Sequence, residues 1–161
     1  MLDSREDNVG GEAVAHLARV LGRADRRLAE RLAEVLTRAG HTLDQWRVLS
    51  VLVDSHGEPR RRAVREVVEA TGVPGPALTR VVDRMVASDL VDRRTDDDDR
   101  RRVLLGITAD GRTLHARLSD LVRAEGAAIE EQVGAAEVAE LARLLARLLT
   151  ATTLDEGTGS Q

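Results

Sequence analysis

Cysteine and lysine are both absent from the 161 residues of the chain. Without cysteine, disulfides, thiolate zinc sites, thiol catalysis and signalling by thiol oxidation are excluded. Without lysine, a Walker A phosphate loop and Schiff-base chemistry are excluded, because both need an amine. Trp46 is the only tryptophan and there is no phenylalanine or tyrosine, which leaves almost nothing for recognition of single strands by base stacking.

Long apolar runs and enzyme motifs are missing too. No stretch approaches the roughly 20 apolar residues of a membrane span, and the polar, acidic residues 1–11 do not resemble a signal peptide, so a cytoplasmic protein is the default expectation. We find no nucleophile elbow, HExxH motif or Gly-rich phosphate loop, which argues against an enzyme. No metal or cofactor is expected, because the histidines show no metal-ligand spacing: they are His16, His41, His56 and His115.

Positive charge is concentrated in the middle of a chain whose formal net charge is -4. Residues 60–112 contain 12 arginines and 10 acidic residues, whereas residues 1–59 contain 8 and 10, and residues 113–161 contain 4 and 8. A basic centre between acidic arms is compatible with binding of nucleic acid by that centre. Any arginine-rich protein shows such fluctuations, so charge alone leaves both interpretations open.

Apolar spacing predicts six helices, over residues 12–39, 42–54, 61–70, 76–88, 109–133 and 136–151. The second begins with a capping-box pattern from Thr42 to Gln45, and Thr108 is expected to cap the fifth. β-branched residues on either side of an aspartate-rich turn predict a hairpin of residues 90–94 and 103–107 with a charged tip. The polar tail, residues 155–161, is expected to be disordered.

Two short helices joined by a three-residue turn and followed by a hairpin indicate a winged helix-turn-helix. The predicted fold class is therefore mainly α with a small β-hairpin, in which the winged helix-turn-helix is flanked by long dimerisation helices. The flanking helices carry leucine stripes, which either pack on each other within one chain or form a dimer interface. The stripes are Leu17, Leu21 and Leu28 in the first helix, and Leu141, Leu145 and Leu148 in the last.

Four motifs between residues 81 and 111 have a specific combined spacing. They are Val81-Val82-Asp83-Arg84-Met85, Leu90-Val91-Asp92-Arg93-Arg94, Asp99-Arg100-Arg101 and Ile107-Thr108-Ala109-Asp110-Gly111. In these motifs the chain resembles the MarR family of bacterial transcriptional regulators, and the resemblance extends over about residues 12–150. It implies a symmetric dimer with two winged-helix lobes under a helical dimerisation region. It also implies repression of transcription, with release of DNA when a small aromatic or phenolic effector binds.

A recognition helix in the major groove places its N-terminal residues at base edges. Thr79 can donate to a base or touch a thymine methyl, and Arg80 fits either a guanine or a phosphate. The family has small polar side chains where this chain has the Pro-Gly-Pro run of residues 74–76, which shifts base reading to Thr79, Arg80 and backbone amides. The residues of this helix expected to contact DNA are Pro76, Ala77, Thr79, Arg80 and Arg84, the last as a phosphate anchor.

The resemblance assigns Arg101 to the minor groove and Asp99 to bracing the wing, and narrow minor grooves do attract arginine. Arg100, between them, is expected to contact DNA as well. The four aspartates at positions 96–99 would repel phosphates, so a solvated hairpin without a role in DNA binding is the alternative. At the start of the preceding helix, arginines either clamp the DNA backbone or form a solvated face: they are Arg60, Arg61, Arg62 and Arg65.

A ligand contact is predicted at Trp46, with His41 just before its helix and Arg47 beside it; a buried core tryptophan is the other interpretation. The expected partners are double-stranded DNA with a palindromic operator, a second copy of the chain and a small aromatic or phenolic effector, with no membrane. The alternative function is a helical dimer that acts through protein–protein interaction without operator binding.

These expectations divide the chain into five parts. Residues 1–11 form a flexible N-terminus, residues 12–54 contain a dimerisation helix and a support helix, and residues 55–112 form the winged helix-turn-helix lobe that binds DNA. Residues 113–154 supply the C-terminal dimerisation helices, and residues 155–161 form the tail.

Overall fold

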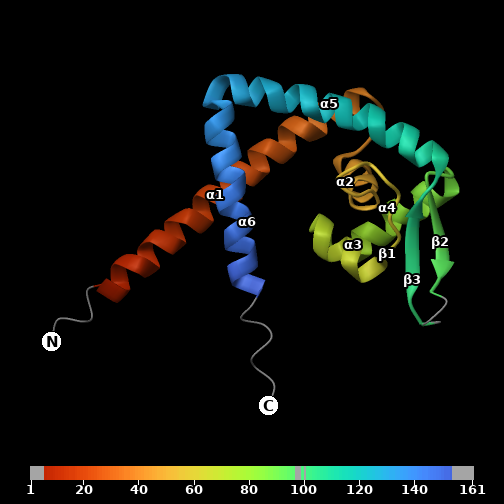
Figure 1. The fold of residues 1–161 in the computed structure, drawn as a ribbon, viewed down its shortest axis with the longest axis horizontal. Coiled ribbons are helices and arrows are strands. Elements are labelled where there is room, and N and C mark those ends of the chain that lie inside the picture. The colour runs from red at the N-terminus through yellow and green to blue at the C-terminus, as the bar shows by residue number, and fades with distance from the viewer. Residues whose placement is uncertain (1–5, 97–98, 100, 154–161) are drawn as a thin grey trace, which may run out of the picture. The chain divides into compact units, whose positions relative to one another are not determined.

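The computed structural model describes residues 6–96, 99 and 101–153. Six helices and three short strands follow one another along these residues (Figure 1). The chain forms two compact units, Met1–Val122 and Arg123–Gln161, whose boundary falls inside the fifth helix. None of the helices in the described ranges combines the length and the apolar character needed to cross a bilayer.

The first helix, α1 (Glu6–Arg38), begins at residue 6, earlier than the predicted start at residue 12. Two consecutive glycines, Gly10 and Gly11, have low helix propensity and favour a later start in the sequence, but the helix continues through them. The N-terminus predicted to be flexible therefore overlaps the helix, while residues 1–5 lie outside the described part of the chain. Near the other end of α1, Leu36 is fully buried in the core.

The predicted capping box of the second helix is confirmed. In α2 (Leu43–Val51), Thr42 Oγ1 accepts from the Gln45 amide at 3.2 Å, and Gln45 Oε1 accepts from the Thr42 amide at 2.9 Å. The helix ends before the predicted residue 54 because the chain turns there: the Arg60 amide donates back to the Leu52 carbonyl at 2.7 Å. Asp54 closes the turn by accepting from two backbone amides, which lower the pKa of its carboxyl.

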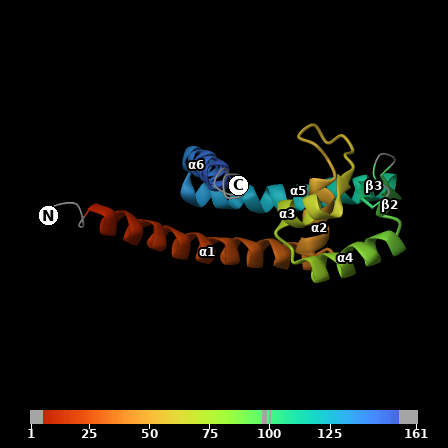
Figure 2. The same cartoon turned by 90° about the horizontal axis from the view of Figure 1, so that it is seen from below.

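The helix-turn-helix consists of α3 (Val64–Thr71) and α4 (Gly75–Ala87). Between them Gly72 adopts a φ of 66°, a left-handed conformation that costs glycine little. In the lobe formed by α2, α3 and α4, α4 lies on the side away from α5 (Figure 2). Its inner face is buried, and the residues of that face are Leu78, Val81, Val82 and Met85.

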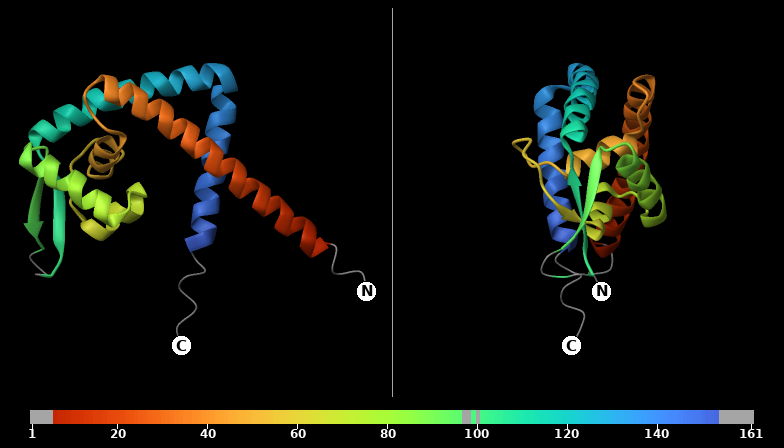
Figure 3. Two further views of the ribbon diagram at one scale, coloured as in Figure 1. Left: turned by 180° about the vertical axis from the view of Figure 1, so that it is seen from behind. Right: turned by 90° about the vertical axis from the view of Figure 1, so that its right-hand side faces the viewer.

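The predicted hairpin is confirmed as β2 (Val91–Thr95) and β3 (Val103–Ile107), with Arg93 opposite Leu105. The sheet has a third strand that the sequence did not indicate, β1 (Arg62–Ala63), which pairs antiparallel with β3 to give the order β1-β3-β2. Residues 61–63 were expected to begin a helix. Two residues are too short to show a strand period, so only pairing with β3 defines β1. The β2–β3 ribbon extends away from the start of α5 (Figure 3).

The junction between the wing and α5 (Ala109–Val133) is built around Thr108, which caps the helix as predicted. Its Oγ1 accepts from the Gly111 amide at 3.0 Å and donates to the Asp89 carbonyl at 2.6 Å. A Cβ at position 111 would overlap the Leu90 carbonyl oxygen. Position 111 therefore requires glycine, because the backbone of Leu90, just before β2, lies against the first turn of α5.

One apolar core holds the first unit together, and its fully buried side chains include Leu36, Leu49, Leu52, Leu78, Met85, Leu105 and Leu118. In the second unit, α5 ends at Val133, Gly134 follows with a φ of 105°, and α6 (Ala135–Thr153) begins at the next residue. Large apolar side chains are nevertheless exposed on the long helices of both units. They are Val14, Leu17, Val20 and Leu28 on α1, Val133 on α5, and Leu141, Leu144, Leu148 and Leu149 on α6.

Candidate nucleic-acid interface

The outer face of α4 is exposed because its inner face is anchored in the core. Arg80 and Arg84 lie four residues apart, on one side of the helix. Neither forms an ion pair within the described part of the chain. The structure brings the residues predicted for this helix together on one surface: Pro76, Ala77, Thr79, Arg80 and Arg84 are all exposed.

The start of α4 offers few backbone donors. The amides of Ala77 and Leu78 both donate to the Pro74 carbonyl at 2.9 Å, and Pro76 has no amide hydrogen. The share of backbone amides in base reading stays a prediction, and the amides of Ala77 and Leu78 are already used inside the helix. Thr79 Oγ1 donates its hydrogen to the Gly75 carbonyl at 3.0 Å. While this bond is present, the hydroxyl oxygen can only accept a hydrogen bond from a ligand.

The turn of the wing is organised by Asp99. Its Oδ1 accepts from the Arg101 amide at 2.9 Å, and its carbonyl accepts from the Arg102 amide at 2.8 Å. Asp99 therefore braces the turn by accepting hydrogen bonds from the backbone amides of Arg101 and Arg102. Arg101 itself is exposed. Arg100, predicted to contact DNA, lies outside the described residues.

The arginines expected at the start of the preceding helix do not lie on it, apart from Arg65. Arg60 and Arg61 precede the sheet, and Arg62 lies in β1, because residues 62–63 pair with β3 before α3 begins. Arg61 binds Asp92 through two hydrogen bonds of 2.7 and 2.8 Å. This contact lowers the pKa of the Asp92 carboxyl and raises the pKa of Arg61. The Arg62 Nε is buried without a hydrogen-bond partner among the described residues.

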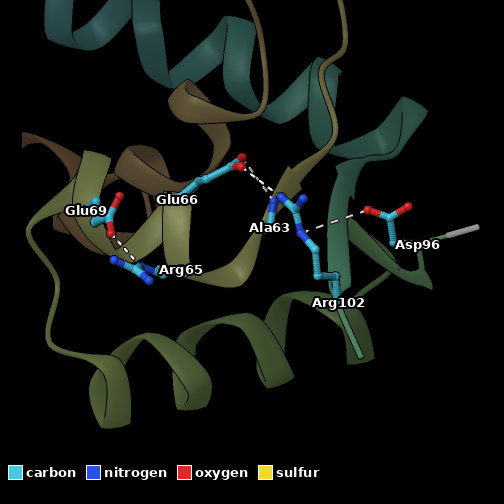
Figure 4. A network of polar contacts seen from close by, with 6 residues as sticks. All are labelled: Ala63, Arg65, Glu66, Glu69, Asp96 and Arg102. Atoms are coloured by element: carbon cyan, nitrogen blue, oxygen red, sulfur yellow. Dashed lines mark hydrogen bonds and ion pairs between the residues drawn. The ribbon is translucent and has the colours of Figure 1, made fainter. Parts of the chain in front are cut away.

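Two further ion pairs join the wing to the helices, and the sequence analysis missed both. Arg93 of β2 binds Asp83 of α4 at 2.6 Å. Arg102, just before β3, binds Glu66 of α3 at 3.0 Å (Figure 4). The partners lie 10 and 36 residues apart, so no local spacing could reveal them. The resemblance motifs did contain Asp83 and Arg93, without indicating that they touch.

The three residues predicted to contact a ligand lie in and just before α2. Trp46 is half-buried, and its Nε1 donates to Ser119 Oγ at 3.3 Å. Arg47 Nη1 lies 3.6 Å from Asp44 Oδ1. His41 Nδ1 is buried without a hydrogen-bond partner among the described residues.

His115, one of the histidines without metal-ligand spacing, belongs to the same network. His115 Nε2 lies 3.1 Å from Ser119 Oγ and 3.3 Å from Ser50 Oγ. Burial lowers the pKa of His115. Trp46, Ser50, His115 and Ser119 thus form a polar cluster between α2 and α5. Two four-residue spacings were the local signals in the sequence, from Trp46 to Ser50 and from His115 to Ser119.

The three-stranded wing, the helix-turn-helix and the exposed arginines define a winged helix-turn-helix protein. A sequence model described as MarR family matches residues 36–102. The chain is 29% identical over 114 residues to the HTH-type transcriptional regulator FarR of Neisseria gonorrhoeae. The aligned residues cover 71% of this chain and 75% of that protein.

Solved structures agree with this match. NadR in complex with 4-hydroxyphenylacetate is 28% identical, with a TM-score of 0.70 over 82% of this chain and 91% of that chain. A mutant of MarR from E. coli, complexed with operator DNA, is 26% identical, with a TM-score of 0.68 over 85% of this chain and 96% of that chain. In sequence and in fold the chain is therefore similar to transcriptional regulators of the MarR family.

Proposed function

We propose that the chain is a transcriptional regulator of the MarR family, a homodimeric repressor that binds an inverted-repeat operator in double-stranded DNA and releases it when a small aromatic acid binds. The observation that carries the proposal is the outer face of α4, where Arg80 and Arg84 are exposed without an ion pair within the described residues. Guanine edges and phosphates are natural ligands for such guanidinium groups. The likeness in fold to a MarR–operator complex supports the same conclusion.

A second copy of the chain is the partner that best accounts for the exposed apolar faces. On α1, Val14 is 66% exposed, and on α6, Leu141 is 53% exposed. Leucine and valine stripes of this kind are covered at helical dimer interfaces. A two-fold dimer would present two recognition helices to half-sites about one helical turn apart.

The proposal assigns a role to three of the five parts of the chain. Residues 12–54 and 113–154 contribute the dimer, and residues 55–112 bind DNA. The function is binding rather than catalysis, and a repressor of this type acts on the chromosome in the cytoplasm. Residues 1–11 and 155–161 have no assigned role.

A small aromatic acid or phenol is the proposed effector. NadR is similar in fold and is complexed with 4-hydroxyphenylacetate. In this chain, Trp46 offers a ring face, His41 offers a buried nitrogen without a partner among the described residues, and Arg47 offers a cation for a carboxylate.

Selection of duplexes from a random pool, followed by a gel shift with the selected sequence, tests DNA binding. We expect an inverted repeat, a footprint with two-fold symmetry, and an affinity that falls steeply with salt. A purified protein that is a stable monomer, or that ignores every duplex at low ionic strength, would contradict the proposal. A dimer without duplex binding would instead support the protein–protein alternative.

The effector can be tested with the fluorescence of the only tryptophan. Titration with 4-hydroxyphenylacetate is expected to change Trp46 emission saturably and to release the operator over the same concentration range. Benzylamine, an aromatic cation, serves as the matched control and should do neither. Saturable quenching without release of DNA would separate ligand binding from regulation and contradict the effector role.

A further inference from the structure

Arg102 and Arg101 are neighbours in the wing, but their side chains have different surroundings. The Arg102 guanidinium lies between two carboxylates, with Nη2 3.0 Å from Glu66 Oε1 and Nε 3.9 Å from Asp96 Oδ2 (Figure 4). Arg101 is exposed and forms no ion pair among the described residues. Arg102 is thus paired with carboxylates, whereas Arg101 is available to an external anion.

Glu66 reaches two elements at once. Its Oε2 accepts from the Ala63 amide at 3.2 Å and closes the N-terminal cap of α3, while Oε1 accepts from Arg102 (Figure 4). Glu69 on the same helix instead pairs with Arg65 on that helix, at 2.8 Å. Glu66 is therefore the carboxylate of α3 that binds the wing.

The pair lies in a groove between α3 and the wing, in which cations outnumber carboxylates. Three arginines line it, together with Glu66 and three apolar residues: the arginines are Arg65, Arg101 and Arg102, and the apolar residues are Ala63, Val64 and Val103. Both partners of the pair are about half exposed, at 45% for Glu66 and 49% for Arg102. Because the guanidinium is accessible, a DNA phosphate in this groove would compete directly with Glu66 for Arg102.

We propose that Glu66 is a positioning residue that masks Arg102 from DNA phosphates and so lowers the affinity of the wing for DNA of any sequence. The inference rests on the proposed DNA-binding function. Phosphate contacts carry no sequence information, so masking one of them leaves a larger share of binding to the base contacts of α4. Glu66 thereby raises the ratio of specific to non-specific binding.

The test is Glu66→Gln, measured by fluorescence anisotropy with a random-sequence duplex across a salt series. Glutamine keeps an oxygen that can accept from the Ala63 amide, so the helix cap is retained while the charge is removed. Arg102 then keeps only the more distant Asp96 as a partner. Its released Nη2 should tighten binding at 50 mM salt by about threefold or more, and should steepen the slope of log K against log salt by about 0.9 for each lobe that contacts DNA. The melting temperature should stay close to that of the wild type.

Two further variants isolate the mechanism. Adding Arg102→Gln to Glu66→Gln should restore the wild-type affinity and slope, because the released cation is gone. Glu34→Gln removes one carboxylate paired with Arg38 on α1 and should leave both values unchanged.

The outcomes separate this inference from the function it rests on. Weaker binding by Glu66→Gln would show that Glu66 only anchors the wing, and unchanged binding would show no masking; either result overturns the inference. An equal gain in Glu34→Gln, or a gain that persists in the double variant, would also overturn it. A wild-type protein that binds no duplex overturns the proposed function, and this inference with it.

Discussion

Arg61 and Asp92 form a bidentate ion pair across the middle strand of the wing sheet, with N–O distances of 2.7 and 2.8 Å. The pair passes over Gly106, which lies opposite Asp92 in the ladder. A Cβ at position 106 would come within 2.7 Å of both Arg61 Nη1 and Asp92 Oδ1. The small residue in β3 therefore makes room for the contact that ties the segment before β1 to β2.

Two glycines in the same region should respond differently to alanine. Gly106→Ala meets only the flexible ends of an exposed ion pair, so we expect it to cost about 0–1 kcal/mol. Gly111→Ala meets the Leu90 backbone, which cannot move without shifting β2, so we expect a cost of about 2 kcal/mol or more. Urea denaturation of the two variants checks the order, and equal losses would contradict this account of the α5 junction.

The Arg61–Asp92 pair predicts a dependence of stability on pH. The pKa of Asp92 lies below its ordinary 3.8, chiefly because Arg61 donates to its ionised form. Its stabilisation is therefore fully present above about pH 3.8 and is lost as the pH falls through the lowered pKa. Asp92→Asn should lower the free energy of unfolding by about 0.5–1 kcal/mol at pH 7, and the difference from wild type should shrink below pH 3.8. Asp25→Asn, on the exposed surface of α1, is the control.

His115 predicts a second pH effect, at milder acidity. Burial lowers its pKa from the ordinary 6.5, so the folded state favours the neutral imidazole. Its contribution to stability is present above pH 6.5 and is lost as the pH falls through the lowered pKa. The melting temperature of the wild type should therefore fall more between pH 7.5 and pH 5 than that of His115→Gln. His56→Gln, in the exposed loop, should behave like the wild type.

On α4, Arg80 and Arg84 should have separable roles. Arg80→Ala should cost about 1–3 kcal/mol with the selected operator and relax the preference at one base pair. Arg84→Ala should weaken binding to all duplexes alike and reduce the salt slope, as expected for a phosphate contact. Binding titrations against the operator and single-base variants distinguish these patterns. If both variants lose affinity uniformly, Arg80 does not read a base.

In the wing, Arg101→Ala should lower operator affinity about tenfold while the dimer stays folded, because a cation in a narrow minor groove is lost. Asp99→Ala should also weaken binding, since the turn that presents Arg101 loses its acceptor for the Arg101 amide. Gel shifts alongside size-exclusion chromatography measure both quantities. Unchanged binding by Arg101→Ala would remove this residue from the mechanism.

Local signals predicted most of the helices and the hairpin. The capping box at Thr42, the cap at Thr108 and the buried side of α4 depend on neighbours within four residues. Such signals are visible in the chain because helix and cap geometry bring nearby residues together. The start of α1 was predicted too late, since glycine propensity is a weak guide when a helix is long.

The chain by itself determined the type of fold and the face of α4 that carries Thr79, Arg80 and Arg84, because periodicity places apolar residues on one side and leaves the others outside. Tertiary structure alone decided that residues 62–63 form a strand, that Arg61 binds Asp92 and that Glu66 binds Arg102. These outcomes depend on partners 31 to 43 residues away. No periodic pattern records such pairings, since they arise only when separate elements pack side by side.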